Sequence, residues 1–234
     1  MRRILEGVKR KNLPAVLVFI DYCKAFDSIN HATMFKILEA YSIPLRLRDA
    51  IKLTYQNLQA KVCSPDGDTD LFKMHAGVMQ GDTLAPFLFV IVLDYALRKA
   101  IDGKEEELGF TLDRRRSRRV AAKVICNLDF AADIVLLLNQ VEQARQLLLR
   151  VETECKDVGL RLNVKKTKSM FYNAAVEDIT TLDGEKVEQA LLEDGEQDFK
   201  YLGSWVEQKR DIQTRKALAW SALRKLEKIW KSTI

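Results

Sequence analysis

The chain has 234 residues, a length that suits one large domain or two small ones. Hydrophobic residues make up 47% of it and charged residues 30%, which is typical of a soluble globular protein and excludes a disordered or collagen-like chain. Lys and Arg outnumber Asp and Glu by 38 to 33, a mild basic excess that is compatible with a polyanionic partner without requiring one.

The cysteines and the apolar runs indicate an intracellular protein, cytoplasmic or nuclear. Four cysteines lie far apart and show no CxxC spacing, so we expect reduced thiols and no disulfide or zinc framework. They are Cys23, Cys63, Cys126 and Cys155. The sequence shows no signal peptide. Its longest apolar run, Leu84–Leu93, is too short to span a bilayer, so we expect no membrane partner.

The first stretch of the chain predicts a short amphipathic helix over residues 1–12, followed by a buried strand over Val16–Ile20 that ends at Asp21. A buried strand that delivers an aspartate is a common way to hold a metal ion rigidly. The alternative is a core strand followed by a capped helix, with Asp27 or Asn30 as the cap. On this stretch alone the alternative is favoured.

Two helices, a hairpin and a glycine-rich loop follow. Helical spacing of apolar residues runs through 34–41, and a second helix opens at Pro44 with Leu47, Ile51, Tyr55 and Leu58 along one face. Residues 60–76 predict a hairpin. The loop that begins at Gly77 leads into a helix that is apolar all round and should be buried. This loop suits either a phosphate site at the helix N-terminus or a plain turn before a core helix.

Residues 103–127 predict a second hairpin with a strongly basic tip. The tip carries Arg114, Arg115, Arg116, Arg118 and Arg119. A tip with one sign of charge is usually a solvated loop, and it is equally suited to contact a phosphate backbone. Both interpretations remain open from the sequence.

The second half predicts two strands, Val120–Phe130 and Ile134–Leu138, around a tight turn that ends at Asp133. A helix with an apolar stripe stops at Gly159. After a lysine-rich segment and an acidic stretch of short strands or loops comes a short strand or hairpin over Phe199–Trp205. A helix over about Asp211–Lys231 closes the chain; because its apolar face needs a packing partner, the chain looks cut from a longer protein.

This order predicts an α+β fold with helices on one face of an antiparallel sheet. Five stretches resemble, in the same order, the palm motifs of reverse transcriptases from non-LTR retrotransposons. They read FIDYCKAFDSINH, GVMQGDTLAPFLF, LDFAADIVLL, GLRLNVKKTK and FKYLGSW. The resemblance implies a reverse-transcriptase-like palm with partial fingers over residues 1–205 and the start of a thumb helix over 206–234.

The resemblance also implies roles for individual residues. Asp21 would hold Mg²⁺ ions, Lys166 would lie near the pyrophosphate, and Phe26 would exclude a ribose 2′-hydroxyl. The nucleotide pocket would include Gln80 and Gly81, and the primer grip would consist of Tyr201, Leu202 and Gly203. The implied partners are an RNA template, a DNA primer and deoxynucleoside triphosphates, together with the remaining parts of a longer polyprotein.

Two departures from the family pattern weaken the catalytic interpretation. Ala132 stands where the family has a metal-binding aspartate, and a methyl group cannot bind a hard cation. Asp133 is the remaining acid, which we expect to be a poor substitute because neighbouring side chains diverge on a hairpin. The upstream finger motifs are absent as well. Three hypotheses follow: an impaired or inactive RNA-directed DNA polymerase, a non-catalytic domain that binds nucleic acid or protein, and a decayed fragment without function.

Overall fold

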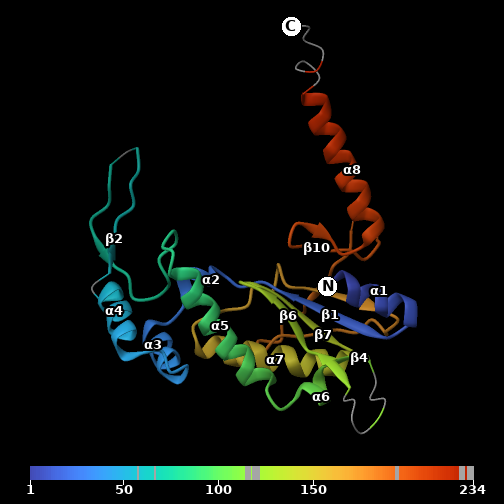
Figure 1. The fold of residues 1–234 in the computed structure, drawn as a ribbon, viewed down its shortest axis with the longest axis horizontal. Coiled ribbons are helices and arrows are strands. Elements are labelled where there is room, and N and C mark those ends of the chain that lie inside the picture. Colours follow the sequence, from blue (N-terminus) through green and yellow to red (C-terminus); the bar gives the residue numbers. More distant parts are fainter. Residues whose placement is uncertain are drawn as a thin grey trace.

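The computed structural model describes residues 1–56, 58–65, 67–113, 117, 122–192, 195–226 and 230 (Figure 1). The helices are α1 (Arg2–Lys11), α2 (Ala25–Ser28), α3 (His31–Ala40), α4 (Leu45–Tyr55), α5 (Ala85–Ile101), α6 (Glu105–Leu108), α7 (Val141–Asp157) and α8 (Gln208–Lys225). The strands are β1 (Ala15–Ile20), β2 (Gln59–Ala60), β3 (Phe72–Lys73), β4 (Phe110–Asp113), β5 (Lys123–Ile125), β6 (Asn127–Phe130), β7 (Asp133–Leu138), β8 (Lys168–Tyr172), β9 (Glu188–Gln189), β10 (Lys200–Tyr201) and β11 (Ser204–Trp205).

A five-stranded sheet forms the centre of the described part of the chain, with strand order β6-β7-β1-β8-β9. Its pairs are antiparallel except for β8 with β9, which is parallel. The predicted strand over Val16–Ile20 is confirmed as β1, which lies in the middle of the sheet and is buried at every residue. An unbroken run of apolar residues is typical of a strand that is covered on both faces.

Successive residues of β1 serve two different cores, because side chains alternate across a strand. Val16, Val18 and Ile20 pack into the core formed with α3, α5 and α7. Leu17 and Phe19 pack on the other face, against α1 and residues 199–206. The long helices therefore lie on one face of the sheet, as predicted, while α1 and the C-terminal hairpin cover part of the second face; Figure 1 shows α5 and α7 on one side of the sheet and β10 on the other.

Two predictions about which helix residues are buried were wrong. The helix expected to be apolar and buried all round is α5, and it leaves Phe87 and Val90 exposed because it packs along one side only. On α4 the apolar face consists of Ile51 and Tyr55, whereas Leu47 is exposed. Leu58 lies beyond the end of α4. Within the described residues, no helix combines the length and the apolar character required to cross a bilayer.

The predicted hairpins form. Strand β2 pairs with β3 and β4 pairs with β5, both antiparallel. The five arginines of the tip between β4 and β5 lie outside the described residues. Residues Phe199–Trp205 form the hairpin β10–β11, whose two-residue turn places Leu202 and Gly203 at positive φ (50° and 75°). Positive φ at both turn residues matches the right-handed twist of the flanking strands.

The loop before α5 packs on the segment that follows β1. The backbone N–H groups of Gly77 and Val78 donate to the carbonyls of Ile29 and Phe26, at 2.8 and 2.6 Å. A Cβ at Gly77 would lie 2.8 Å from the Asp27 backbone, which is closer than real contacts allow. Gly81 has nearly the same φ (91° against 89°) but nothing within 4 Å of such a Cβ. The two glycines of this loop therefore differ in packing, not in backbone conformation.

The C-terminal helix α8 extends away from the body of the protein (Figure 1) and is anchored at its first turn by Asp211. The Oδ2 atom of this buried carboxylate accepts from Arg2 at 2.7 Å and from Arg215 at 2.8 Å. Its Oδ1 atom accepts from the Trp205 backbone N–H at 3.1 Å. One side chain thus joins α1, β11 and α8.

Substitution Asp211→Asn tests this anchor. The Arg215 guanidinium holds the pKa of Asp211 below its ordinary value, so its stabilisation is present above the pKa of the unfolded chain and is lost as pH falls through the folded pKa. We expect the variant to be less stable than the wild type at about pH 7 and the difference to shrink below about pH 4. Urea denaturation of both proteins at both pH values measures this difference in the free energy of unfolding. Asp178→Asn, which alters the exposed pair with Lys186, is the control and should change neither value.

Substitutions Gly77→Ala and Gly81→Ala test the packing of the loop. Each should lose about 1 kcal/mol because an alanine is strained at positive φ. Gly77→Ala should lose roughly 2 kcal/mol more, since its Cβ would overlap the Asp27 backbone. The free energy of unfolding from urea denaturation is the measurement, and equal losses in the two variants would contradict the close approach.

Candidate active site

Asp21 and Asp133 lie at the same end of the sheet, although 112 positions separate them in the sequence (133 − 21). Strand β1 runs antiparallel to β7 with Ile20 opposite Ile134, so the next residues outward are Asp21 and Asp133. Both line a cavity of about 430 Å³. Four lysines line it as well: Lys165, Lys166, Lys168 and Lys200. The structure therefore brings two acids and a group of cations together at this edge.

Backbone contacts hold Asp21 and leave its carboxylate free. Its N–H donates to Thr167 Oγ1 at 3.3 Å, and its carbonyl accepts from the Asn163 N–H at 2.8 Å. The side chain is 37% exposed as a whole, yet its Oδ2 atom is buried and accepts no hydrogen bond. The nearest cation is Lys166, whose Nζ lies 3.9 Å from Oδ2, too far for a hydrogen bond. A buried carboxylate oxygen without a donor is suited to a cation.

The turn between β6 and β7 directs the side chains of Ala132 and Asp133 to different sides of the sheet. Phe130 pairs directly with Asp133, which leaves a two-residue turn in which Ala131 has φ 51°. The Ala132 side chain packs against the core on the helix-covered face, whereas Asp133 lines the cavity with Asp21. Neighbouring side chains therefore diverge at this hairpin, and it is Asp133 that lines the cavity with Asp21, because the tight turn returns the chain to β7 in register.

The two carboxylates fit a divalent cation of the Mg²⁺ type. Such an ion binds through one or two carboxylates and takes its other ligands from water and substrate phosphates. Asp21 offers the unpartnered oxygen and Asp133 a second carboxylate in the same cavity. Among the described residues, no group of three or more His, Cys, Asp or Glu side chains is arranged to hold a metal. A site built here depends on ligands from the substrate.

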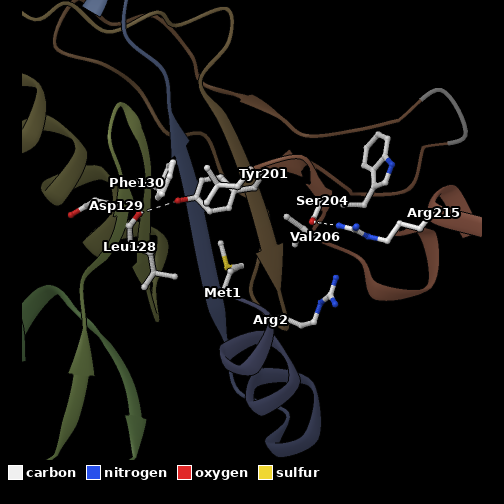
Figure 2. Close-up of a pocket in the computed structure, with 11 residues that line it drawn as sticks. Met1, Arg2, Leu128, Asp129, Phe130, Tyr201, Ser204, Val206 and Arg215 are labelled. Carbon is white, nitrogen blue, oxygen red and sulfur yellow. Dashed lines mark hydrogen bonds between the residues drawn. The ribbon is translucent and has the colours of Figure 1, made fainter. Parts of the chain in front are cut away.

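Tyr201 connects the C-terminal hairpin to the acidic edge. Its hydroxyl is a donor 3.3 Å from the Leu128 carbonyl, as Figure 2 shows, and 3.2 Å from the Asp133 carbonyl. Its ring lies 5.8 Å from that of Phe19, which also contacts Phe199 at 4.3 Å. Burial, followed by the charges of Asp133 and Asp129, raises the pKa of Tyr201 to about 12, so the hydroxyl remains a donor.

A second cavity, of about 500 Å³, lies on the other side of Tyr201. Figure 2 shows it between Leu128 and Phe130 of β6 and the side chains of Arg2 and Arg215, with the Arg215 guanidinium directed at Ser204. Tyr201 and Leu202 line both cavities. A Cβ added at Gly203 would have no atom within 4 Å. Hairpin β10–β11 is thus the wall between the two.

The structure places the predicted nucleotide-pocket residues elsewhere. Phe26 stacks on Phe89 with ring centroids 4.6 Å apart and lies at the helix-side core, outside the cavity that Asp21 lines. Gln80 donates to Asp27 Oδ1 at 3.0 Å, and Gly81 follows it in the exposed loop. Of the predicted residues, the structure brings together Asp21, Asp133, Lys166, Tyr201 and Leu202. The others lie apart from them, in or next to the segment that follows β1: Phe26, Gln80 and Gly81.

Sequence reasoning missed three of the cavity lysines. Lys165, Lys168 and Lys200 line the cavity beside Lys166, and Lys168 is paired with Glu188. The signal was present in the motifs KKTK and FKYLGSW, where lysines stand next to positions that had been assigned. It was not used because single exposed lysines are usually solvated surface.

Comparisons with known proteins identify the family and the fold. Residues 1–206 match the family described as "Reverse transcriptase (RNA-dependent DNA polymerase)". The Pol polyprotein of the type-1 retrotransposable element R2 of Nasonia vitripennis is 30% identical over 167 residues, which are 71% of this chain and 15% of that protein. The polyprotein of the type-2 element R2DM of Drosophila melanogaster is 31% identical over 147 residues, 63% of this chain and 13% of that protein. The chain thus spans about a seventh of the length of these relatives.

Solved structures show the same fold. Apo telomerase from Candida tropicalis, truncated from its C-terminal domain, superimposes with a TM-score of 0.54 at 17% identity, covering 76% of this chain and 36% of that one. Telomerase from Candida albicans, in complex with a fragment of telomeric RNA, gives 0.52 at 12% identity, with 77% and 31% covered. The antiparallel sheet with its long helices is therefore a reverse-transcriptase-like palm. The chain belongs to the reverse transcriptase (RNA-dependent DNA polymerase) family, as a domain of the non-LTR retrotransposon type.

Proposed function

We propose that this chain is the palm of an RNA-directed DNA polymerase that adds deoxynucleotides to a DNA primer by two-metal nucleotidyl transfer, with a metal site weakened at Ala132. The observation that carries the proposal is the buried Oδ2 of Asp21, which accepts no hydrogen bond and lies in a cavity shared with Asp133. The partners are an RNA template, a DNA primer, deoxynucleoside triphosphates and the rest of a longer polyprotein inside the cell. Residues 1–205 form the palm with partial fingers, and 206–234 begin the thumb.

Asp21 and Asp133 would hold the Mg²⁺ ions. When bound, these ions lower the pKa of the primer 3′-hydroxyl and stabilise charge on the leaving pyrophosphate. Lys166, whose Nζ lies 3.9 Å from Asp21 Oδ2, partly neutralises this carboxylate, and would leave it to a cation bound there. Its ammonium group is then free to bind a phosphate oxygen of the substrate.

Hairpin β10–β11, the wall between the two cavities, would position the primer. The Tyr201 hydroxyl is fixed to the carbonyl of Asp133, so hairpin β10–β11 and the acidic turn move as one unit. Tyr201, Leu202 and Gly203 would hold the primer end beside Asp21. Phe26, Gln80 and Gly81, which lie around the segment after β1, would bind the incoming nucleotide and exclude a 2′-hydroxyl.

Ala132 lowers the affinity of the metal site. Its methyl group provides no oxygen ligand at the position next to Asp133. Asp133 then supplies the second carboxylate alone. Because a divalent ion of this kind uses few protein ligands, the loss of one removes much of the stabilisation that the ions give to the transition state.

Substitution Ala132→Asp tests this proposal. It should raise the affinity for Mn²⁺, measured by calorimetric titration, by about tenfold or more, since one carboxylate is added. Ala131→Asp adds the same charge one residue away and is the matched control, for which little change is expected. In a longer chain that supplies fingers and thumb, Ala132→Asp should also restore primer extension that Asp21→Ala abolishes.

Two results would contradict the proposal. Strong Mg²⁺-dependent synthesis by the unmodified chain would show that Asp21 and Asp133 suffice and that the site is not weakened. Absence of primer extension by the longer Ala132→Asp chain, despite restored metal binding, would support a domain that binds nucleic acid or protein without catalysis.

The arginines between β4 and β5 would contribute non-specific affinity for nucleic acid. Replacement of Arg114, Arg115, Arg116, Arg118 and Arg119 by Gln should weaken binding and reduce the salt dependence by about 0.7–0.9 per lost phosphate contact. Fluorescence anisotropy of labelled oligonucleotides over a range of salt concentrations measures the slope. Lys36→Gln, an exposed lysine on α3, is the control. An unchanged slope would mean that the tip is only solvated surface.

A further inference from the structure

The segment that follows β1 and the loop before α5 are bound together along their length. Two backbone hydrogen bonds run from Gly77 and Val78, and the one from Gly77 to Ile29 belongs to an isolated antiparallel bridge between Asn30 and Ala76. Gln80 donates to Asp27 at 3.0 Å. Backbone contacts and one side chain near the end of the loop therefore set the position of residues 76–80 relative to residues 26–30.

His31 adds a side-chain contact at the middle of this arrangement. Its Nε2 atom lies 2.6 Å from the carbonyl oxygen of Gly77. A carbonyl can only accept, so Nε2 carries the proton and donates. Gly77 is buried, and this part-buried contact provides its carbonyl with a hydrogen-bond donor. Without the histidine, the loop would leave a buried acceptor unpaired, which favours its opening.

We propose that His31 is a positioning residue: by donating from Nε2 to the Gly77 carbonyl, it fixes the loop that presents Gln80. His31 stands at the start of α3 and is held from the other side by Tyr55, whose ring lies edge-on with centroids 5.1 Å apart. Helices α3 and α4 thereby determine where the loop lies. That this loop binds the incoming nucleotide rests on the proposed function; that His31 fixes it does not.

Two substitutions separate the hydrogen bond from the ring packing. His31→Phe keeps a ring against Tyr55 and removes the donor. His31→Gln removes the ring and keeps an amide N–H that reaches about as far as Nε2. A purely structural role in packing would be preserved by Phe and lost with Gln, while the positioning role predicts the reverse. His75, the second histidine of the chain, is exposed, and His75→Gln is the matched control.

Hydrogen exchange of the Gly77 and Val78 amides measures the opening of the loop directly, because both donate to the segment after β1. We expect His31→Phe to accelerate exchange of these amides about tenfold, while amides of β1 and α7 exchange as in the wild type. His31→Gln and His75→Gln should leave all of them unchanged. Equal exchange in wild type and His31→Phe, or equal acceleration of β1 and the loop, would overturn the proposal.

A measurement on the unmodified chain decides the matter if His31→Phe does not fold. Nitrogen-15 spectra of the two histidines should show His31 as the Nε2–H tautomer with a slowly exchanging ring proton, and His75 with a rapidly exchanging one. An Nδ1–H tautomer at His31 would overturn the proposal. In a polymerase assay of the longer chain that carries Ala132→Asp, His31→Phe should raise KM for the deoxynucleotide with little change in kcat; absence of primer extension by that chain with His31 intact would count against the proposed function and leave the exchange result valid.

Discussion

The burial of β1 on both faces is the constraint on which the rest of the structure depends. A strand with apolar residues at every position needs one core above the sheet and another below it. Helices α3, α5 and α7 supply the first, and α1 with residues 199–206 supplies the second. Because these cores lock β1 from both sides, the residue at its end, Asp21, has a fixed position from which its carboxylate reaches the cavity.

The charged residues of the cavity and the apolar residues of the same motifs lie on different faces of the sheet. Asp21, Asp133 and the cavity lysines lie at the edge where residues 199–202 cover the sheet. Ala132 and Phe26 pack toward the helix-side core. The tight turn after β6 is the point of separation, since it directs neighbouring residues to different sides.

The segment that follows Asp21 packs against two other parts of the structure. Loop 76–80 packs on one side of residues 26–31 through backbone hydrogen bonds and His31. On the other side, Asn30 donates its N–H to the carbonyl of Val158 at the end of α7, where a Cβ on Gly159 would lie 2.3 Å from the Ser28 carbonyl. The segment is therefore packed between a loop and a helix end.

Local periodicity and the order of five motifs were enough to predict β1, the helix that ends before Gly159, the hairpins, and a palm of the reverse transcriptase family with Asp21 at its edge. These features depend on spacing within short stretches, which the sequence contains in full. The orientation of Asp133 toward Asp21, the stacking of Phe26 on Phe89, the lysines around the cavity and the bond from His31 to Gly77 depended on the tertiary structure. Each joins residues that are distant in the chain or separated by a turn, and no local pattern encodes which surfaces meet after the two cores close around β1.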